Sequence, residues 1–263
     1  MPARDPRALL GSAVLIAALA VPAAAPAAGW VPHVREAVAY AQTRKGEVRF
    51  AVRTEHGLWG YRRTSPVHSA SVVKALLLVA YLDHPAVRGR PLRPADHALI
   101  DPMIRRSDNQ AANRVLAFVG ARRVQATARR VGMSRFRLNP IVWGGSLIDA
   151  SDQTRFFLHF EAHVVARHRA TALRLLASIV PSQRWGIGKA RPDGWRLYFK
   201  GGWGAGTGLV DHQVALLVHG SDRVAAAVLT TGNPDHAYGQ QTLRGVFARL
   251  LRGLGPALVL SPL

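Results

Sequence analysis

The order of apolar and polar residues predicts a helix and a hairpin near the start of the chain. Apolar residues recur at helical spacing over residues 30–44 and predict an amphipathic helix. Residues 47–53 alternate and predict a strand, which the turn at Glu55-His56-Gly57 connects to a second strand over residues 58–62. The segment Ala75–Leu82 follows and contains only apolar residues and one tyrosine, so a helix formed from it would have no polar face and is predicted to be buried.

The middle of the chain has an almost wholly helical pattern. The exception is the stretch 135–148, where Pro140 and the pair Gly144-Gly145 predict an irregular loop. After Pro181 the pattern changes to strands and one final helix. The predicted helices of the middle are 95–105, 108–119, 121–131, 150–166 and 169–180; the later strands are 195–200, 208–219 and 224–230, and the last helix is 239–254.

These elements predict an α/β fold of the α+β type. An antiparallel sheet, layered with the two terminal helices, carries an inserted all-α region, and a site is expected in the crevice between the two parts. The sheet part covers about residues 29–65 and 185–263, and the all-α part about 66–184.

The first 28 residues have the features of a signal peptide. Arg4 and Arg7 precede an apolar stretch over 8–21, and small residues over 22–28 suit signal peptidase. We therefore expect residues 1–28 to be cleaved and the protein to be secreted. No cysteine stands near the cleavage site, so a lipid anchor is not expected.

The formal net charge of +20 favours contact with anionic surfaces. Membrane faces and anionic cell-wall polymers are candidate partners. Nucleic acid is not an expected partner, because the basic residues are scattered and no nucleic-acid-binding motif is present. The chain has no cysteine, which excludes disulfides and thiolate metal sites. His159 and His163 lie four apart with His168 nearby, but we expect a solvated helix face there, and neither metal nor cofactor.

Ser71-Val72-Val73-Lys74 stands at the head of the buried apolar helix. Residues three apart lie on one face of a helix, so the Ser71 hydroxyl and the Lys74 amine are expected to meet in a poorly hydrated site. Burial lowers the pKa of a lysine, which would let Lys74 act as a base toward a nucleophilic Ser71. Chance spacing, with one lysine extending to solvent from an apolar helix, is the structural alternative.

Two further motifs carry candidate chemistry, each with a structural alternative. Ser107-Asp108-Asn109 precedes a predicted helix, where such residues commonly cap the N-terminus, but a serine there could also relay a proton. Lys200-Gly201-Gly202-Trp203 ends a predicted strand. It is either a strand terminus or a cation facing a pocket, beside backbone that can touch substrate.

Together the three motifs resemble those of class A β-lactamases and penicillin-binding proteins. The resemblance spans roughly residues 30–255 and implies the β-lactamase/DD-peptidase-like fold for a serine hydrolase domain over 29–263. It implies that Ser71 is acylated, that Lys74 is its base or a proton relay, and that Ser107 passes a proton to the leaving nitrogen. It also implies that Asn109 binds the substrate amide, that Lys200 attracts the substrate carboxylate beside Gly201 and Gly202, and that the N–H groups of Ser71 and Trp203 form the oxyanion hole.

The chain departs from the family pattern at two places. No Asp or Glu lies between Asn109 and Ile148, so the glutamate that activates the deacylating water in class A β-lactamases has no counterpart there. Asp149 follows and is expected to cap the next helix or anchor the loop. Gly201 replaces the usual threonine or serine, for which Thr207 or Arg184 are possible substitutes.

The expected function is that of a secreted, monomeric β-lactamase-like serine hydrolase acting through an acyl-enzyme. Its substrates would be β-lactams, or peptidoglycan-derived D-alanyl peptides. Deacylation is expected to be slow, and a DD-peptidase or penicillin-binding-like protein without efficient turnover is the first alternative. A non-catalytic, basic cell-wall-binding protein on the same scaffold is the second. Two of the four lysines stand in the motifs, which favours catalysis.

Overall fold

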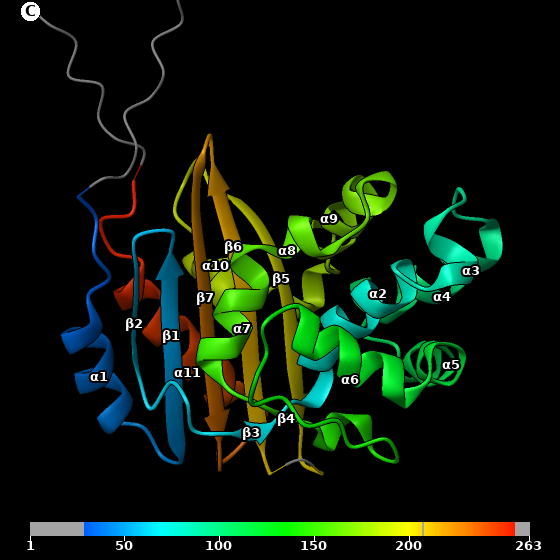
Figure 1. Ribbon diagram of the computed structural model, residues 1–263. Coiled ribbons are helices and arrows are strands. Elements are labelled where there is room, and N and C mark those ends of the chain that lie inside the picture. The colour runs from blue at the N-terminus through cyan, green and yellow to red at the C-terminus, as the bar shows by residue number, and fades with distance from the viewer. Residues whose placement is uncertain (1–28, 207, 256–263) are drawn as a thin grey trace, which may run out of the picture.

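The computed structural model describes residues 29–206 and 208–255, so the predicted signal peptide lies outside the described part. Its centre is a five-stranded sheet in the order β2-β1-β7-β6-β5, with every neighbouring pair antiparallel (Figure 1). The strands are β1 (Glu47–Thr54), β2 (Gly57–Tyr61), β5 (Arg196–Gly204), β6 (Val210–His219) and β7 (Asp222–Thr231). A small second sheet pairs β3 (Val67–His68) with β4 (Leu147–Ile148). The predicted antiparallel sheet is confirmed.

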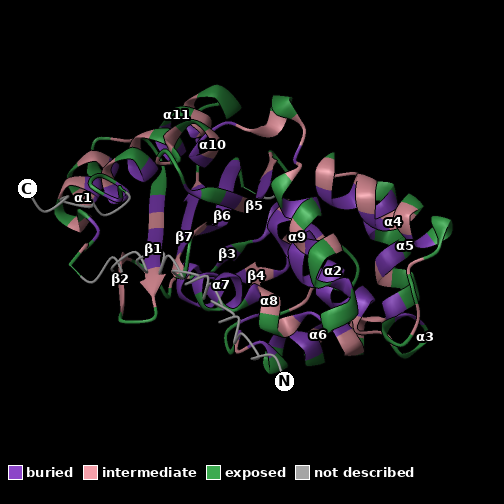
Figure 2. Ribbon diagram, turned by 90° about the horizontal axis from the view of Figure 1, so that it is seen from above, coloured by how far each residue is buried: buried purple, intermediate pink, exposed green. Residues whose placement is uncertain are grey.

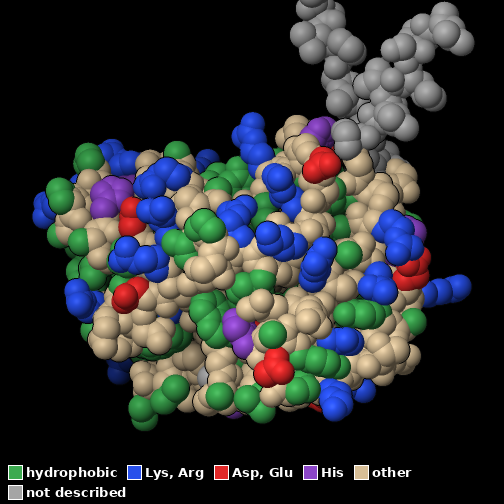
Figure 3. Space-filling view, turned by 180° about the vertical axis from the view of Figure 1, so that it is seen from behind, with side chains coloured by type: hydrophobic (Ala, Val, Ile, Leu, Met, Phe, Trp, Pro, Cys, Tyr) green, Lys and Arg blue, Asp and Glu red, His purple; other side chains and the backbone are tan. Residues whose placement is uncertain are grey.

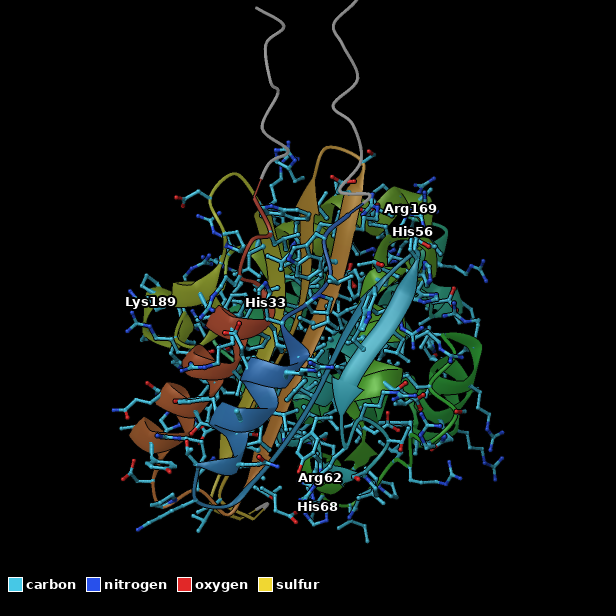
Figure 4. All side chains as sticks on the ribbon, turned by 90° about the vertical axis from the view of Figure 1, so that its left-hand side faces the viewer. His33, His56, Arg62, His68, Arg169 and Lys189 are labelled. Carbon is cyan, nitrogen blue, oxygen red and sulfur yellow. The ribbon has the colours of Figure 1, made fainter. Side chains whose placement is uncertain are left out.

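Helices cover both faces of the sheet. α1 (Val34–Gln42) and α11 (His236–Leu250) pack against each other on one face, as Figure 4 shows. α7 (Ala150–Leu158) packs on β1, β6 and β7 from the other face. Because both faces are covered, β6 and β7 are buried over most of their length (Figure 2).

The second group of helices surrounds α2 (Lys74–Leu82), which is buried at every residue, as its apolar sequence predicts. Each fully buried leucine in such a helix contributes about 2 kcal/mol. The group also contains α3 (Pro85–Arg88), α4 (Pro94–Arg105), α5 (Asn109–Val119), α6 (Ala121–Arg130) and α9 (Arg169–Ala177). The short α10 (Ile187–Ala190) packs instead against α11. Short 3₁₀ helices are η1 (Ala70–Val73), η2 (Trp143–Gly145), η3 (Ala166–His168) and η4 (Pro181–Gln183).

The predicted helix over 150–166 is wrong in its extent. It breaks at His159 into α7 and α8 (Phe160–His163), and α7 lies on the sheet. The expectation of a solvated histidine face holds for His159, which is exposed, but not for the other two histidines: His163 stacks on Phe156 at 5.9 Å and His168 is buried. Among the described residues no group of three or more His, Cys, Asp or Glu could hold a metal. No helix in that part of the chain has the length and apolarity to cross a membrane.

Asp149 performs both tasks expected of it. Its carboxylate is buried, accepts the Asp152 N–H at 2.8 Å as the cap of α7, and accepts Arg135 Nε at 2.6 Å from the preceding loop.

We expect Asp149→Ala to lower the free energy of unfolding by about 2 kcal/mol, because it removes a helix cap and a charge-assisted hydrogen bond. Urea unfolding measures the change, with the exposed Asp193→Ala as the matched control. Equal stabilities of the two variants would contradict this account.

Candidate active site

Ser71 lies in a tight turn where the edge of the sheet meets the helical group. It is the second residue of η1, and the α-helix proper begins only at Lys74. Ala70 before it has a positive φ of 43°, a conformation that costs a non-glycine residue about 1–2 kcal/mol. The buried Ser69 fixes this turn: its N–H donates to Ser146 O at 2.7 Å. The nucleophile candidate is therefore held rigidly against the loop 135–148.

Lys74 is fully buried, and its amine is directed toward the second motif. Nζ donates to Ser107 O at 2.5 Å, to Asn109 Oδ1 at 2.7 Å and to Ser107 Oγ at 3.3 Å. Among the described residues, the Ser71 hydroxyl does not accept a hydrogen bond from the Lys74 amine. Burial lowers the pKa of Lys74 to about 7, partly opposed by the carboxylate of Asp108. At neutral pH the amine is therefore ready both to take up and to release a proton.

Ser107 lies between the two motif lysines. Its Oγ accepts from Lys200 Nζ at 3.0 Å as well as from Lys74, and its backbone has a positive φ of 60°. Lys200 is also buried and donates to Gly201 O at 2.8 Å. Burial, with the nearby charge of Lys74, holds the pKa of Lys200 well below its usual range. Asp108 caps α5 through Ala111 N, so the helix-capping interpretation of this motif holds for Asp108.

The end of β5 runs beside the Ser71 turn. A Cβ at Gly202 would lie 2.7 Å from Ser71 N and 2.9 Å from Val72 N, so only glycine permits this approach. The next residue, Trp203, belongs to the same strand. The N–H groups predicted to form the oxyanion hole therefore come from two segments in direct contact.

We expect Gly202→Ala to reduce the rate of Ser71 acylation by about 100-fold, the size of effect seen when an oxyanion donor is lost. The added methyl group forces β5 away from the turn. Stopped-flow acylation measures the rate, and Gly89→Ala, outside the site, is the matched control, since a Cβ there would meet nothing within 4 Å. Equal rates in both variants would exclude this role for Gly202.

Trp143 is a residue of the site that the sequence reasoning missed. It lies in η2 within the loop 135–148, and its ring centroid is 4.7 Å from Lys74 Nζ. Its Nε1–H donates to Asn113 Oδ1 at 2.7 Å. No spacing rule points to it, because a single tryptophan in an irregular loop has no pattern.

A second feature without a sequence signal is an aromatic cluster on the outer side of β5. Trp185 and Trp203 pack edge to face at 5.8 Å, and His236 stacks on Trp203 at 5.7 Å. His236 Nδ1 is 2.5 Å from the buried Asp211 carboxylate. Trp203 and His236 of this cluster, together with Gly204 and Leu209, line a cavity of about 200 Å³.

Trp185 rather than Arg184 faces Gly201. The guanidinium of Arg184 donates to Ala177 O at 3.0 Å and lies over the Phe199 ring. Thr207, the other candidate for the missing hydroxyl, lies outside the described residues.

Positive charge is spread out over the face seen in Figure 3 rather than gathered in one patch. Figure 3 shows lysine and arginine side chains distributed across one whole face with few acids among them. Arg62 and Lys189 lie at different edges of the molecule in Figure 4. On the face shown, the basic residues are scattered as the sequence suggests.

Comparisons with known proteins agree with this architecture. The model of the beta-lactamase enzyme family matches residues 96–252. A β-lactamase from Sphaerobacter thermophilus superimposes with a TM-score of 0.72 at 20% identity, covering 83% of this chain and 95% of that one. The reconstructed class A β-lactamase of the last common ancestor of Gram-negative bacteria gives 0.69 at 19% identity, covering 82% of this chain and 97% of that one.

A third solved structure, PBP-A, gives a TM-score of 0.70 at 15% identity and covers 89% of this chain and 99% of that one. No curated protein matches the sequence. The protein has the fold shared by class A β-lactamases and PBP-A. It belongs to the beta-lactamase enzyme family, as the resemblance of the three motifs implies.

Proposed function

We propose that the protein is a serine hydrolase that forms an acyl-enzyme on Ser71. Its substrates are β-lactams or peptidoglycan-derived D-alanyl amides and esters. The observation that carries this proposal is the position of Ser107 Oγ, within 3.3 Å of Lys74 Nζ and 3.0 Å of Lys200 Nζ, beside the Ser71 turn. Two buried lysines that both hydrogen-bond to the Ser107 hydroxyl can pass protons through it. A serine with a purely structural role does not require two such partners.

Acylation uses these groups in sequence. Neutral Lys74, which in this structure bonds to Ser107 and Asn109, turns toward Ser71 and takes the hydroxyl proton while Ser71 Oγ attacks the substrate carbonyl. The Ser71 and Trp203 N–H groups stabilise the oxyanion. The carbonyl–nitrogen bond then breaks, and the proton reaches the leaving nitrogen through Ser107. Lys200 attracts the substrate carboxylate, whose negative charge favours the protonated amine, and Asn109 binds the substrate amide. The product of this step is an ester between Ser71 and the acyl group.

Deacylation is the slow step of the proposed cycle. The loop 135–148 contains no carboxylate, and the first acid after it, Asp149, is occupied by Asp152 N and Arg135. Water therefore lacks the general base that a fast hydrolase provides, a group worth roughly 10²–10⁴-fold in rate. This favours the penicillin-binding-like form of the function over a β-lactamase with rapid turnover.

The protein acts outside the cytoplasm under this proposal. Residues 1–28 serve as a cleaved signal peptide, and the mature chain works as a monomer. The distributed positive charge holds it near anionic cell-wall polymers, and its action requires no cofactor.

Intact-protein mass spectrometry after incubation with a fluorescent penicillin tests the function. We expect one adduct per chain, located by digestion to the peptide that contains Ser71, with a lifetime of many minutes. Penicillin consumption without an adduct would point instead to a β-lactamase with an unrecognised base. Neither adduct nor consumption, for penicillin and for a D-alanyl depsipeptide, would favour the basic cell-wall-binding protein.

A further inference from the structure

Trp143 covers one side of the Lys74 amine. The ring centroid lies 4.7 Å from Nζ, while the three hydrogen-bond acceptors of that amine come from Ser107 and Asn109. A cation over an indole ring is stabilised by about 1–2 kcal/mol when it is desolvated. The Lys74 amine thus has polar atoms toward the second motif and a carbon ring toward the loop.

The position of the ring is fixed from two directions. On one side Trp143 Nε1–H donates to Asn113 Oδ1 at 2.7 Å, one helical turn beyond Asn109 on α5. On the other, the buried Ser69 Oγ lies 3.4 Å from both Trp143 O and Gly144 O, while its shortest acceptor is Ala70 O at 3.1 Å. The same Ser69 fixes the Ser71 turn, so the ring and the nucleophile share one support.

The polar side chains of the loop are turned to the loop itself. Asn139 Oδ1 accepts the N–H groups of Ile141 and Val142, at 3.1 and 2.9 Å. Ser146 Oγ accepts Asn139 N at 3.0 Å, and Arg135 pairs with Asp149. An ordered water needs two to four polar partners, and Asn139 Oδ1, Ser146 Oγ and Arg135 already have partners within the protein.

We propose that Trp143 is the residue that decides what takes the acyl group from Ser71, by shielding the loop side of the ester from water so that an amine is the preferred acceptor. The inference rests on the proposed acyl-enzyme. Trp143 is a positioning residue in this scheme, because it acts by excluding water and by holding Lys74 against Ser107 and Asn109.

Transfer to an amine needs only groups that are already in place. It is the reverse of acylation, so the incoming amine follows the path by which the leaving amine departed. The amine nitrogen attacks the ester carbonyl, a carbon–nitrogen bond forms, and the carbon–Oγ bond of Ser71 breaks. The amine proton passes through Ser107 and Lys74 to Ser71 Oγ, which restores the free enzyme. Hydrolysis would require a water and a base on the loop side.

The test uses a D-alanyl thioester substrate with D-alanine or glycine as the amine acceptor. Mass spectrometry measures the ratio of transfer product to hydrolysis product, and the acylation rate is measured separately. We expect transfer to predominate in the wild type, and Trp143→Ala to lower the ratio by about tenfold or more through faster hydrolysis. Trp143→Phe, which keeps a ring, should retain most of the ratio.

Asn113→Ala tests the same idea without removing the ring. This variant removes the acceptor of Trp143 Nε1 and should lower the ratio of transfer to hydrolysis by a smaller factor. Ile141→Ala changes an exposed residue of the same loop and should leave that ratio unchanged. An unchanged ratio in Trp143→Ala with normal acylation would overturn the inference and leave the acyl-enzyme standing. Failure of the wild type to acylate would overturn the acyl-enzyme and the inference together.

Discussion

Replacing Ser71 with alanine should abolish adduct formation and lower the rate of D-alanyl ester cleavage by about 10⁴-fold or more. The hydroxyl is the atom to which the acyl group becomes attached, and no neighbouring group can replace it at that position. The turn that carries it is held by Ser69 and by Gly202, both outside the substituted side chain. The substitution therefore removes the reacting atom and leaves the site in place.

Intact-protein mass and stopped-flow fluorescence measure both effects. The exposed Ser134→Ala is the matched control and should retain the wild-type rate. Residual labelling of Ser71→Ala at the wild-type rate would identify a different nucleophile and remove the basis of the proposed function. Thermal unfolding should give closely similar midpoints for the variant and the wild type, because the Ser71 side chain is not part of the core.

Replacing Lys74 with methionine should lower the acylation rate by about 10³-fold, within the range for loss of a general base. Methionine fills most of the volume of the lysine side chain but cannot accept a proton. The wild-type rate should rise about tenfold per pH unit up to pH 7 and then level off, since the base is the neutral amine and its pKa is about 7. The variant should lack this rise.

The same lysine should make stability depend on pH. Its pKa falls from 10.5 in the unfolded chain to about 7 in the folded one, so the unfolded chain binds more protons above pH 7. The free energy of unfolding should therefore increase from pH 7 toward pH 10.5, and part of that slope should disappear in Lys74→Met. Urea titrations across this range measure it. An identical slope in both proteins would show that Lys74 titrates normally.

The fold was largely predictable from local pattern. The alternating segment 47–53 corresponds to β1. The long apolar runs after Pro181 correspond to β6 and β7, because strands that are covered on both faces require continuous apolar sequence. The helix over 150–166 was predicted too long, because periodicity continues across His159 while the backbone does not. α3 and α10, of one turn each, are too short for any periodic signal.

The sequence by itself determined the chemistry that is available. The serine–lysine spacing, the order of the three motifs and the absence of a carboxylate between Asn109 and Ile148 are all readable without a structure. They are local or countable properties, fixed by composition and spacing. Whether the three motifs meet in space was only implied by family resemblance.

Tertiary structure alone decided how those groups are used. Lys74 bonds to Ser107 and Asn109 because α2 and α5 pack together, a contact that spacing within one helix cannot predict. Trp143 reaches Lys74 because Ser69 and Asn113, distant in sequence, fix the loop from two sides. Long-range packing sets these distances, and the proton path and the access of water depend on them.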